Sequence, residues 1–175
     1  MRVLLIKMSS LGDVVHTLAA VTDAVRALPE IKFDWVVEEA YAEIPRWHLA
    51  VRRVIPIGLR RWRKNFVATL RKNEWAQFRK ELRRDSYDLI LDAQGLMKSA
   101  WIGWQGRGTL AGRDWSSVRE RLAATFYQKR HAIDLALPEV EQLRQLFSLA
   151  LGYPQPAIAA KFGVDRSRLQ KSYLE

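Results

Sequence analysis

Four small or acidic residues follow the first apolar run of the chain and could take part in chemistry. Ser9, Ser10, Gly12 and Asp13 come directly after the run that ends at Met8. A glycine lets the backbone approach a ligand closely, and a carboxylate can act as a general base. Asp13 could equally cap a helix, where negative charge is favourable, and on the residues alone this is the simpler interpretation. The turn has the glycine spacing of neither a dinucleotide fingerprint nor a P-loop.

A long stretch of the chain carries basic residues with no acidic residue among them. It lies between Glu43 and Glu74, and its basic residues are Arg46, Arg52, Arg53, Arg60, Arg61, Arg63, Lys64, Arg71 and Lys72. The densest part is residues 60–64, where Trp62 adds an apolar surface. Arginine binds carboxylates and phosphates through paired hydrogen bonds. A solvated helix face is one interpretation, but the imbalance favours anion binding, with nucleic acid among the candidate ligands.

A second polar turn follows a later apolar run, at residues 92–95 (DAQG), with a lysine close behind. Gln94 and Lys98 could bind polar groups of a substrate. Asp92 could be a ligand or a buried structural carboxylate, and the residues alone do not decide. If both turns lie at the carboxyl ends of parallel strands, they meet at one edge of the sheet.

The histidines and most of the tryptophans indicate structure rather than chemistry. His16, His48 and His131 have no metal-ligand spacing, and the chain has no cysteine. We therefore expect no metal site and no cofactor-binding residue. Most of the seven tryptophans are expected in the core, and the glycine-rich residues 104–112 are expected to form a mobile loop.

Hydrophobic periodicity places these residues on alternating strands and helices. Continuous apolar runs predict strands at residues 2–8, 33–37, 54–57, 89–91 and, weakly, 109–111. Spacings of three and four predict helices at residues 14–28, 74–84 and 138–151, with another after Gly95. Such alternation is typical of an α/β fold with a mainly parallel sheet flanked by helices. Pro154 and Pro156 indicate a linker, and the rest of the chain reads as a helix-prone tail with little to pack against.

Composition limits the class of protein. The chain has 175 residues, 49% of them hydrophobic, which is enough for one core. Its formal net charge of +10 predicts an anionic partner: nucleic acid, an acidic membrane surface, or a phosphorylated or carboxylated substrate. The opening apolar run is too short for a signal peptide, and no window suits a membrane span. These features predict a soluble cytoplasmic protein.

Four segments resemble one enzyme family. They are residues 1–18 (MRVLLIKMSSLGDVVHTL), 33–39 (FDWVVEE), 60–65 (RRWRKN) and 92–100 (DAQGLMKSA). Together they are similar to the N-terminal half of the lipopolysaccharide heptosyltransferase I family, within glycosyltransferase family 9. The resemblance covers roughly residues 1–153. It implies the N-terminal, acceptor-binding Rossmann-like domain of a GT-B glycosyltransferase, and it makes residues 154–175 a linker or the start of a second domain.

The resemblance also implies a reaction. Such enzymes transfer L-glycero-D-manno-heptose from ADP-heptose to the first Kdo of Kdo2-lipid A, with inversion and without a metal, at the cytoplasmic face of the inner membrane. The resemblance places the catalytic base at Asp13, which overturns the interpretation of this residue as only a helix cap. It assigns acceptor contacts to Ser9, Ser10, Gly12, Arg60, Arg61, Arg63, Lys64, Gln94, Lys98 and Arg119. The same basic residues could steer the protein to an anionic membrane surface.

Two departures and two alternatives accompany this expectation. The family is about twice as long, so the donor-binding residues have no counterpart here, and this chain alone should not turn over efficiently. Residues 101–114 replace a more regular helical stretch of the family. The alternatives are a heptosyltransferase that adds the second heptose, and a basic α/β domain that binds anions or nucleic acid without catalysis. The resemblance implies that no nucleic acid is bound.

Overall fold

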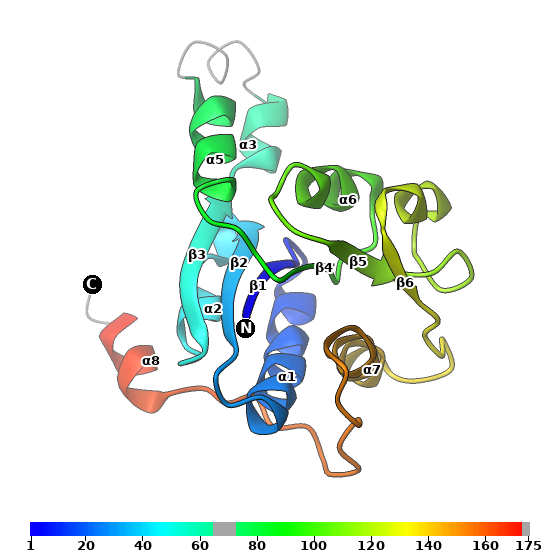
Figure 1. The fold of residues 1–175 in the computed structure, drawn as a ribbon. Helices are drawn as coiled ribbons and strands as arrows, with labels where there is room; N and C mark the ends of the chain where they lie inside the picture. Colours follow the sequence, from blue (N-terminus) through cyan, green and yellow to red (C-terminus); the bar gives the residue numbers. More distant parts are fainter. Residues whose placement is uncertain (65–72, 173–175) are drawn as a thin grey trace.

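The computed structural model describes residues 1–64 and 73–172 of the chain. Its centre is a parallel sheet with the strand order β3-β2-β1-β4-β5-β6 (Figure 1). The strands are β1 (Arg2–Ile6), β2 (Lys32–Glu38), β3 (Val51–Ile57), β4 (Leu89–Asp92), β5 (Leu110–Arg113) and β6 (Lys129–His131). The expected α/β class with a parallel, helix-flanked sheet is confirmed.

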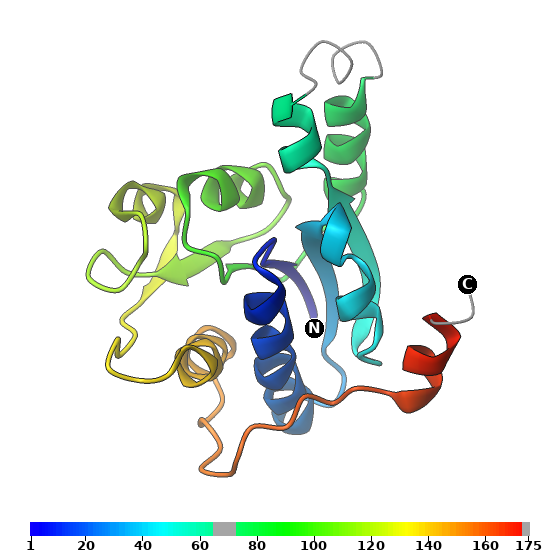
Figure 2. The ribbon, with the colours of Figure 1, turned by 180° about the vertical axis from the view of Figure 1, so that it is seen from behind.

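Helices cover both faces of the sheet. They are α1 (Leu11–Ala27), η1 (Glu39–Tyr41), α2 (Glu43–Arg46), α3 (Leu59–Lys64), α5 (Glu74–Leu82), α6 (Met97–Trp104), η2 (Arg121–Phe126), α7 (Glu139–Leu151) and α8 (Arg166–Ser172). Figures 1 and 2 show α1 and α7 on one side of the sheet and α5 and α6 on the other. No helix among the described residues has both the length and the apolar character needed to cross a bilayer.

The two layers explain why the first strand is apolar throughout. Val3 and Leu5 pack in the cluster that contains α1 and α7, whereas Leu4 and Ile6 pack in the cluster that contains α5, α6 and η2. Side chains alternate between the faces of a strand, so a strand covered on both faces needs apolar residues at every position. This burial fixes the carboxyl end of β1, where the first polar turn begins.

The structure refines the expectations for the tryptophans and for the glycine-rich segment. Trp35 is fully buried and Trp47, Trp62 and Trp75 pack against the core, whereas Trp101, Trp104 and Trp115 are each more than 40% exposed. In the glycine-rich residues 104–112, residues 105–109 form a loop, and the flanking residues belong to the end of α6 and the start of β5. A Cβ on Gly112 would overlap the ring of Tyr127, so close packing accounts for that glycine. The strand β6 was not expected, because three basic and polar residues show no strand pattern.

The tail after α7 also packs on the domain, contrary to expectation. Figures 1 and 2 show it passing the end of α1 before it reaches α8. Arg144 donates hydrogen bonds to the carbonyls of Pro156 (3.1 Å) and Ile158 (2.9 Å). Further on, the N–H of Asp165 donates to the carbonyl of Trp47 at 2.8 Å. The boundary at residues 153/154 stays a prediction.

His48 lies under this tail and makes stability depend on pH. The side chain is 5% exposed; Nδ1 accepts the N–H of Ala50, and Nε2 lies 3.2 Å from the hydroxyl of Thr22. Burial first, and then the charges of Arg168 and Lys32, lower the pKa of His48 from 6.5 to about 4. The unfolded chain therefore binds the proton more readily, and stability is lost as the pH falls from 6.5 towards 4.

We expect the free energy of unfolding to fall by about 2 kcal/mol between pH 7 and pH 5 through His48 alone. Urea denaturation gives the free energy of unfolding of the wild type and of His48→Asn at both pH values. The contribution of His48 is the difference between the two proteins in how much this free energy changes with pH. His16→Asn is the control, because it makes the same substitution at an exposed histidine on α1. Equal pH slopes for wild type and His48→Asn would contradict the assignment.

Candidate functional site

Two polar turns meet at the carboxyl edge of the sheet, because β1 and β4 are adjacent and parallel. The side-chain oxygen of Gln94 accepts hydrogen bonds from the N–H groups of Met8 (3.0 Å) and Ser9 (3.1 Å). β2 lies on one side of β1 and β4 on the other, so the chain changes direction across the sheet at this point. Open α/β sheets bind their ligands at such switch points. Gln94, expected as a substrate contact, uses its oxygen to hold one turn against the other.

Asp13 lies at this edge, in the first turn of α1, with its side chain 19% exposed. Its Oδ2 accepts the N–H of Ser10 at 3.2 Å and lies 3.7 Å from the guanidinium of Arg119 and 4.0 Å from the ammonium of Lys7. Within the described part of the chain, no donor hydrogen-bonds to Oδ1. The capping and catalytic roles are therefore compatible: one oxygen caps the helix, and the other can accept a proton.

The rest of the first turn leaves room beside Asp13. Ser9 is half-buried, whereas Ser10 and Gly12 are exposed, and the peptide bond between the two serines is cis. A Cβ on Gly12 would meet no protein atom within 4 Å. The space in front of this backbone is open, as a ligand that approaches the turn would require.

Three charged residues that no sequence pattern indicated complete the edge: Lys7, Arg113 and Glu139. Lys7 is fully buried and places its Nζ 3.1 Å from the carbonyl of Ala93 and 3.4 Å from Glu139. Glu139, the first residue of α7, also faces Arg119 at 3.3 Å and Arg113 at 3.6 Å. Burial lowers the pKa of Lys7, and the carboxylates of Asp13 and Glu139 act against that shift. The edge therefore combines three cations with two carboxylates.

Asp92 is a structural carboxylate. It is fully buried and accepts hydrogen bonds from the N–H groups of Gln94 and Gly95 and from the hydroxyls of Ser99 and Tyr127. Burial raises the pKa of Asp92, and these donors act against that shift. The alternative that the sequence left open is thus decided in favour of structure. With its oxygens occupied, Asp92 shapes the second turn and does not face solvent.

The basic stretch lies at the sheet edge formed by β3, two strands away from β1, roughly 10 Å. Arg60 is exposed and donates to the hydroxyl of Tyr41 at 3.2 Å. Arg61 is paired with Glu39 (3.0 Å) and Glu74 (2.7 Å), and these hydrogen bonds raise its pKa. Its charge is therefore already balanced by two carboxylates.

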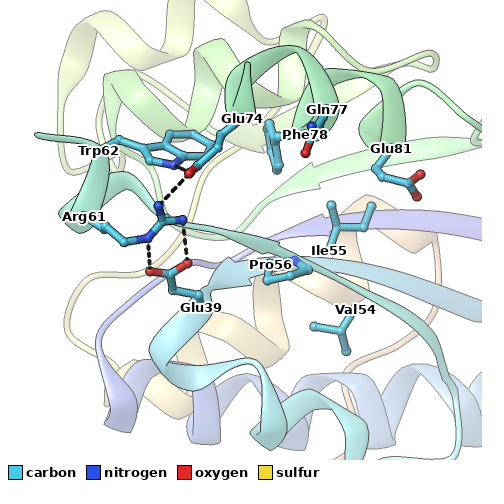
Figure 3. A pocket seen from close by; sticks show the side chains of 11 residues that line it. Glu39, Val54, Ile55, Pro56, Arg61, Trp62, Glu74, Gln77, Phe78 and Glu81 are labelled. Atoms are coloured by element: carbon cyan, nitrogen blue, oxygen red, sulfur yellow. Dashed lines mark hydrogen bonds and ion pairs between the residues drawn. The ribbon is translucent and has the colours of Figure 1, made fainter. Parts of the chain in front are cut away.

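A pocket of about 610 Å³ beside β3 also has its positive charge balanced by carboxylates (Figure 3). Its lining residues are Glu39, Val54, Ile55, Pro56, Gly58, Arg61, Trp62, Glu74, Gln77, Phe78 and Glu81. Figure 3 shows Arg61 bridging Glu39 and Glu74 at one end. Three carboxylates and one arginine make a poor site for an anion. This pocket is separate from the edge that carries Asp13.

The other expected contacts lie at different places. Arg63 and Lys64 end α3, and their side chains lie outside the described part of the structure, as do residues 65–72 with Arg71 and Lys72. Lys98 is exposed on α6. Arg119 is 41% exposed and reaches both Asp13 and Glu139. The structure thus brings Arg119, Ser9, Ser10, Gly12 and Gln94 to Asp13.

No group of three His, Asp or Glu side chains in the described residues could hold a metal ion. His48 is engaged in hydrogen bonds, and His131 is half-buried with its pKa lowered by burial. His16 is exposed on α1. The three histidines thus lie at separate places in the described structure.

These features define an α/β domain whose charged edge, at a switch point of a parallel sheet, is shaped for a polar ligand. The family model of glycosyltransferase family 9 (heptosyltransferase) matches residues 75–173, and the chain belongs to this family. It is 55% identical over 170 residues to lipopolysaccharide heptosyltransferase 1 of Pseudomonas aeruginosa, covering 97% of this chain and 48% of that protein. It is 48% identical to the Escherichia coli protein of the same name, covering 94% of this chain and 52% of the relative. The chain thus spans about half the length of these relatives.

Solved structures agree in fold. The structure of E. coli heptosyltransferase WaaC with ADP is 49% identical and superposes with a TM-score of 0.90, over 93% of this chain and 51% of that one. That protein is a GT-B glycosyltransferase, which confirms the expected fold. E. coli ADP-heptose lipopolysaccharide heptosyltransferase II, at 19% identity and a TM-score of 0.68, shares the fold.

Proposed function

We propose that this chain is the acceptor-binding half of a lipopolysaccharide heptosyltransferase, with Asp13 as the general base. The full reaction transfers L-glycero-D-manno-heptose from ADP-heptose to the first Kdo of Kdo2-lipid A. The observation that carries the proposal is the position of Asp13, between Lys7 and Arg119 and at an open edge of the sheet. A relative of 49% identity is solved with ADP-2-deoxy-2-fluoro heptose, which supports a donor of this class.

The proposed chemistry is a single displacement with inversion. Asp13 takes the proton of the acceptor hydroxyl through its free Oδ1, and the acceptor oxygen attacks the anomeric carbon of the heptose. The new glycosidic bond forms as the bond from that carbon to the ADP phosphate breaks, and ADP leaves. Lys7 and the N–H of Ser10 hold Oδ2, so that the carboxylate is oriented before the substrate binds. The proposed reaction uses no metal and no resident cofactor.

The acceptor is proposed to lie across the edge from Asp13 towards the basic stretch. Ser9, Ser10, Gly12 and Arg119 would contact the Kdo sugar, with the amide of Gln94 and the ammonium of Lys98 on its other side. The lipid A phosphates would meet Arg60, Arg63 and Lys64, and Arg61 once it releases its carboxylates. Such an acceptor lies in the inner membrane, so we place the protein at its anionic cytoplasmic face.

Gly12 provides one test of this arrangement. We expect Gly12→Ala to leave the fold at least as stable, because the new methyl group meets no protein atom and alanine favours a helix by up to about 1 kcal/mol over glycine. Its affinity for the acceptor should fall by about tenfold, since the methyl group occupies ligand space. Denaturation and titration with delipidated Kdo2-lipid A check both halves. Unchanged affinity would contradict the close approach.

The main test is a titration of this chain with delipidated Kdo2-lipid A, alone and with Arg60, Arg61, Arg63 and Lys64 changed to alanine. We expect saturable binding by the wild type and its loss in the fourfold variant. Arg60→Ala alone should weaken binding, whereas Arg61→Ala should act mainly on stability, because Arg61 links α3 to Glu39 and Glu74. No binding by the folded wild-type chain would contradict an acceptor site within these residues.

The same titration separates the alternatives. An acceptor that already carries one heptose should bind more weakly if the first heptose is the one transferred. Tighter binding of that acceptor would assign the chain to the second transfer. An oligonucleotide should bind weakly, and tight binding with a steep salt dependence would favour a nucleic-acid module instead.

A further inference from the structure

Helices α5 and α6 present tryptophans on the side of the sheet away from α1 and α7. Trp101 is 43% exposed and Trp104 is 59% exposed. Trp101 stacks on Trp75 of α5, with ring centroids 4.9 Å apart and planes at 12°. Trp104 meets the edge of Phe126 at 6.4 Å. Adjacent large aromatic side chains with this exposure indicate an interaction surface rather than a core.

An open hollow of about 680 Å³ lies along α5. It is lined by Ala76, Arg79, Lys80, Glu81, Arg83, Arg84 and Arg107. Its one carboxylate, Glu81, is already paired with Arg53 at 3.1 Å and lies 3.9 Å from Arg84. Over the described ranges, the other four cations form no ion pair. The hollow is therefore strongly positive.

Trp75 and Arg79 lie four residues apart on α5 and therefore share one side of that helix, which brings the tryptophans and the hollow together. We call this surface the α5–α6 face. It consists of Trp75, Arg79, Lys80, Arg83, Arg84, Trp101, Trp104 and Arg107. The Trp75–Trp101 stack joins the two helices, and Arg107 follows Trp104 by three residues. Residues 97–113 contain no Asp or Glu, so no acidic side chain interrupts the aromatic part.

The α5–α6 face lies on the side of the sheet opposite α1 and α7 (Figures 1 and 2). After α7 the chain runs from Gly152 along the α1 side to α8, so the described residues leave the tryptophans of the α5–α6 face uncovered. The aromatic and cationic side chains of this face match a surface that is both apolar and negatively charged.

We infer that the α5–α6 face docks on an anionic lipid bilayer. Tryptophan is enriched where a protein meets the headgroup region, because its ring is apolar and its N–H is polar. Basic side chains near such a surface are attracted by anionic lipid headgroups. Trp101 and Trp104 enter the headgroup region, and the arginines of the hollow meet lipid phosphates. The inference deepens the proposed function, on which it rests for a membrane-borne acceptor.

Vesicle sedimentation tests the inference with this chain. The vesicles contain phosphatidylglycerol and phosphatidylcholine, or phosphatidylcholine alone, and no acceptor, so the outcome does not depend on sugar transfer. We expect binding to the anionic vesicles only. Trp101→Ala with Trp104→Ala should weaken it by about tenfold, and Arg79→Gln with Arg83→Gln by about thirtyfold.

Matched variants on the α7 side and the tail serve as controls. Leu135→Ala with Leu149→Ala removes two apolar side chains that are 57% and 47% exposed. Lys161→Gln with Arg166→Gln removes two exposed charges, so this variant has the same net charge as the variant with Arg79→Gln and Arg83→Gln. Both controls should bind vesicles like the wild type.

Three results would overturn the inference. The first is no binding of the wild type to anionic vesicles, or equal loss in the control pairs. The second is a dimer in sedimentation velocity that the tryptophan pair abolishes, which would make a second copy the occupant. The third is tighter binding of an oligonucleotide that the arginine pair abolishes. Acceptor binding without vesicle binding would leave the proposed function standing and remove only the docking face.

Discussion

Asp13→Asn is expected to lower kcat for heptosyl transfer by about 10²- to 10⁴-fold, the usual contribution of a general base. The measurement needs an enzyme that joins this chain to a donor-binding half, with ADP release followed over time. KM for the acceptor should change little, because asparagine keeps the shape of the side chain and can still accept the Ser10 N–H through its oxygen. The loss then falls on the proton transfer rather than on binding.

Asp88→Asn is the matched control for this variant. This variant makes the same Asp-to-Asn substitution at the opposite edge of the sheet, where Asp88 is exposed and accepts the N–H of Arg2 at 2.7 Å. Its kcat should equal that of the wild type. An Asp13→Asn enzyme with a wild-type rate would remove Asp13 from the mechanism, while the family and the fold would stand.

Arg144→Ala is expected to cause the largest loss of stability, about 3–5 kcal/mol. Arg144 and Asp23 form an ion pair in which both side chains are at most 2% exposed, and Arg144 also donates to Glu141 and to the tail. Burial alone would lower the pKa of Arg144, but the hydrogen bonds to Asp23 and Glu141 raise it. The alanine variant leaves the buried carboxylate of Asp23 without its cation.

Urea denaturation at pH 7 measures this loss, and a double variant identifies its cause. Arg144→Leu with Asp23→Leu should recover much of the stability, since no unpaired charge remains buried. If the single and double variants were equally unstable, the loss would come from packing and from the tail rather than from the charge. Arg166→Ala, an exposed arginine of α8, should change stability by less than about 0.5 kcal/mol.

The sequence predicted the strands and helices that carry strong apolar patterns. Residues 2–8, 33–37 and 89–91 read as buried strands because both of their faces are covered, and they correspond to β1, β2 and β4. Elements whose segments have weak or polar patterns were predicted less well. β6 is a short basic edge strand that pairs only with β5 in the described sheet, so its sequence carries no apolar signal.

The candidate site could be predicted only where its residues follow a strand end. Ser9, Gly12 and Asp13 have that signal, whereas Lys7 lies within residues 2–8, which were predicted as one strand. Glu139 comes to Lys7 across 132 positions of the chain, a contact that no local pattern encodes. The carboxylates that neutralise Arg61 were hidden for the same reason, because Glu39 and Glu74 flank the basic stretch instead of interrupting it.

The strand order has a consequence for the way this chain is made. β1 pairs with β2 and β4, so one of its edges stays unpaired until residue 92 has left the ribosome. The turn that carries Asp13 cannot take its final form earlier, since Gln94 holds it in place. All residues up to Gln94 must therefore be synthesised before this edge closes. During that interval the apolar strand 3–6 is open to pairing with other chains, which makes early synthesis the stage at which aggregation threatens this fold most.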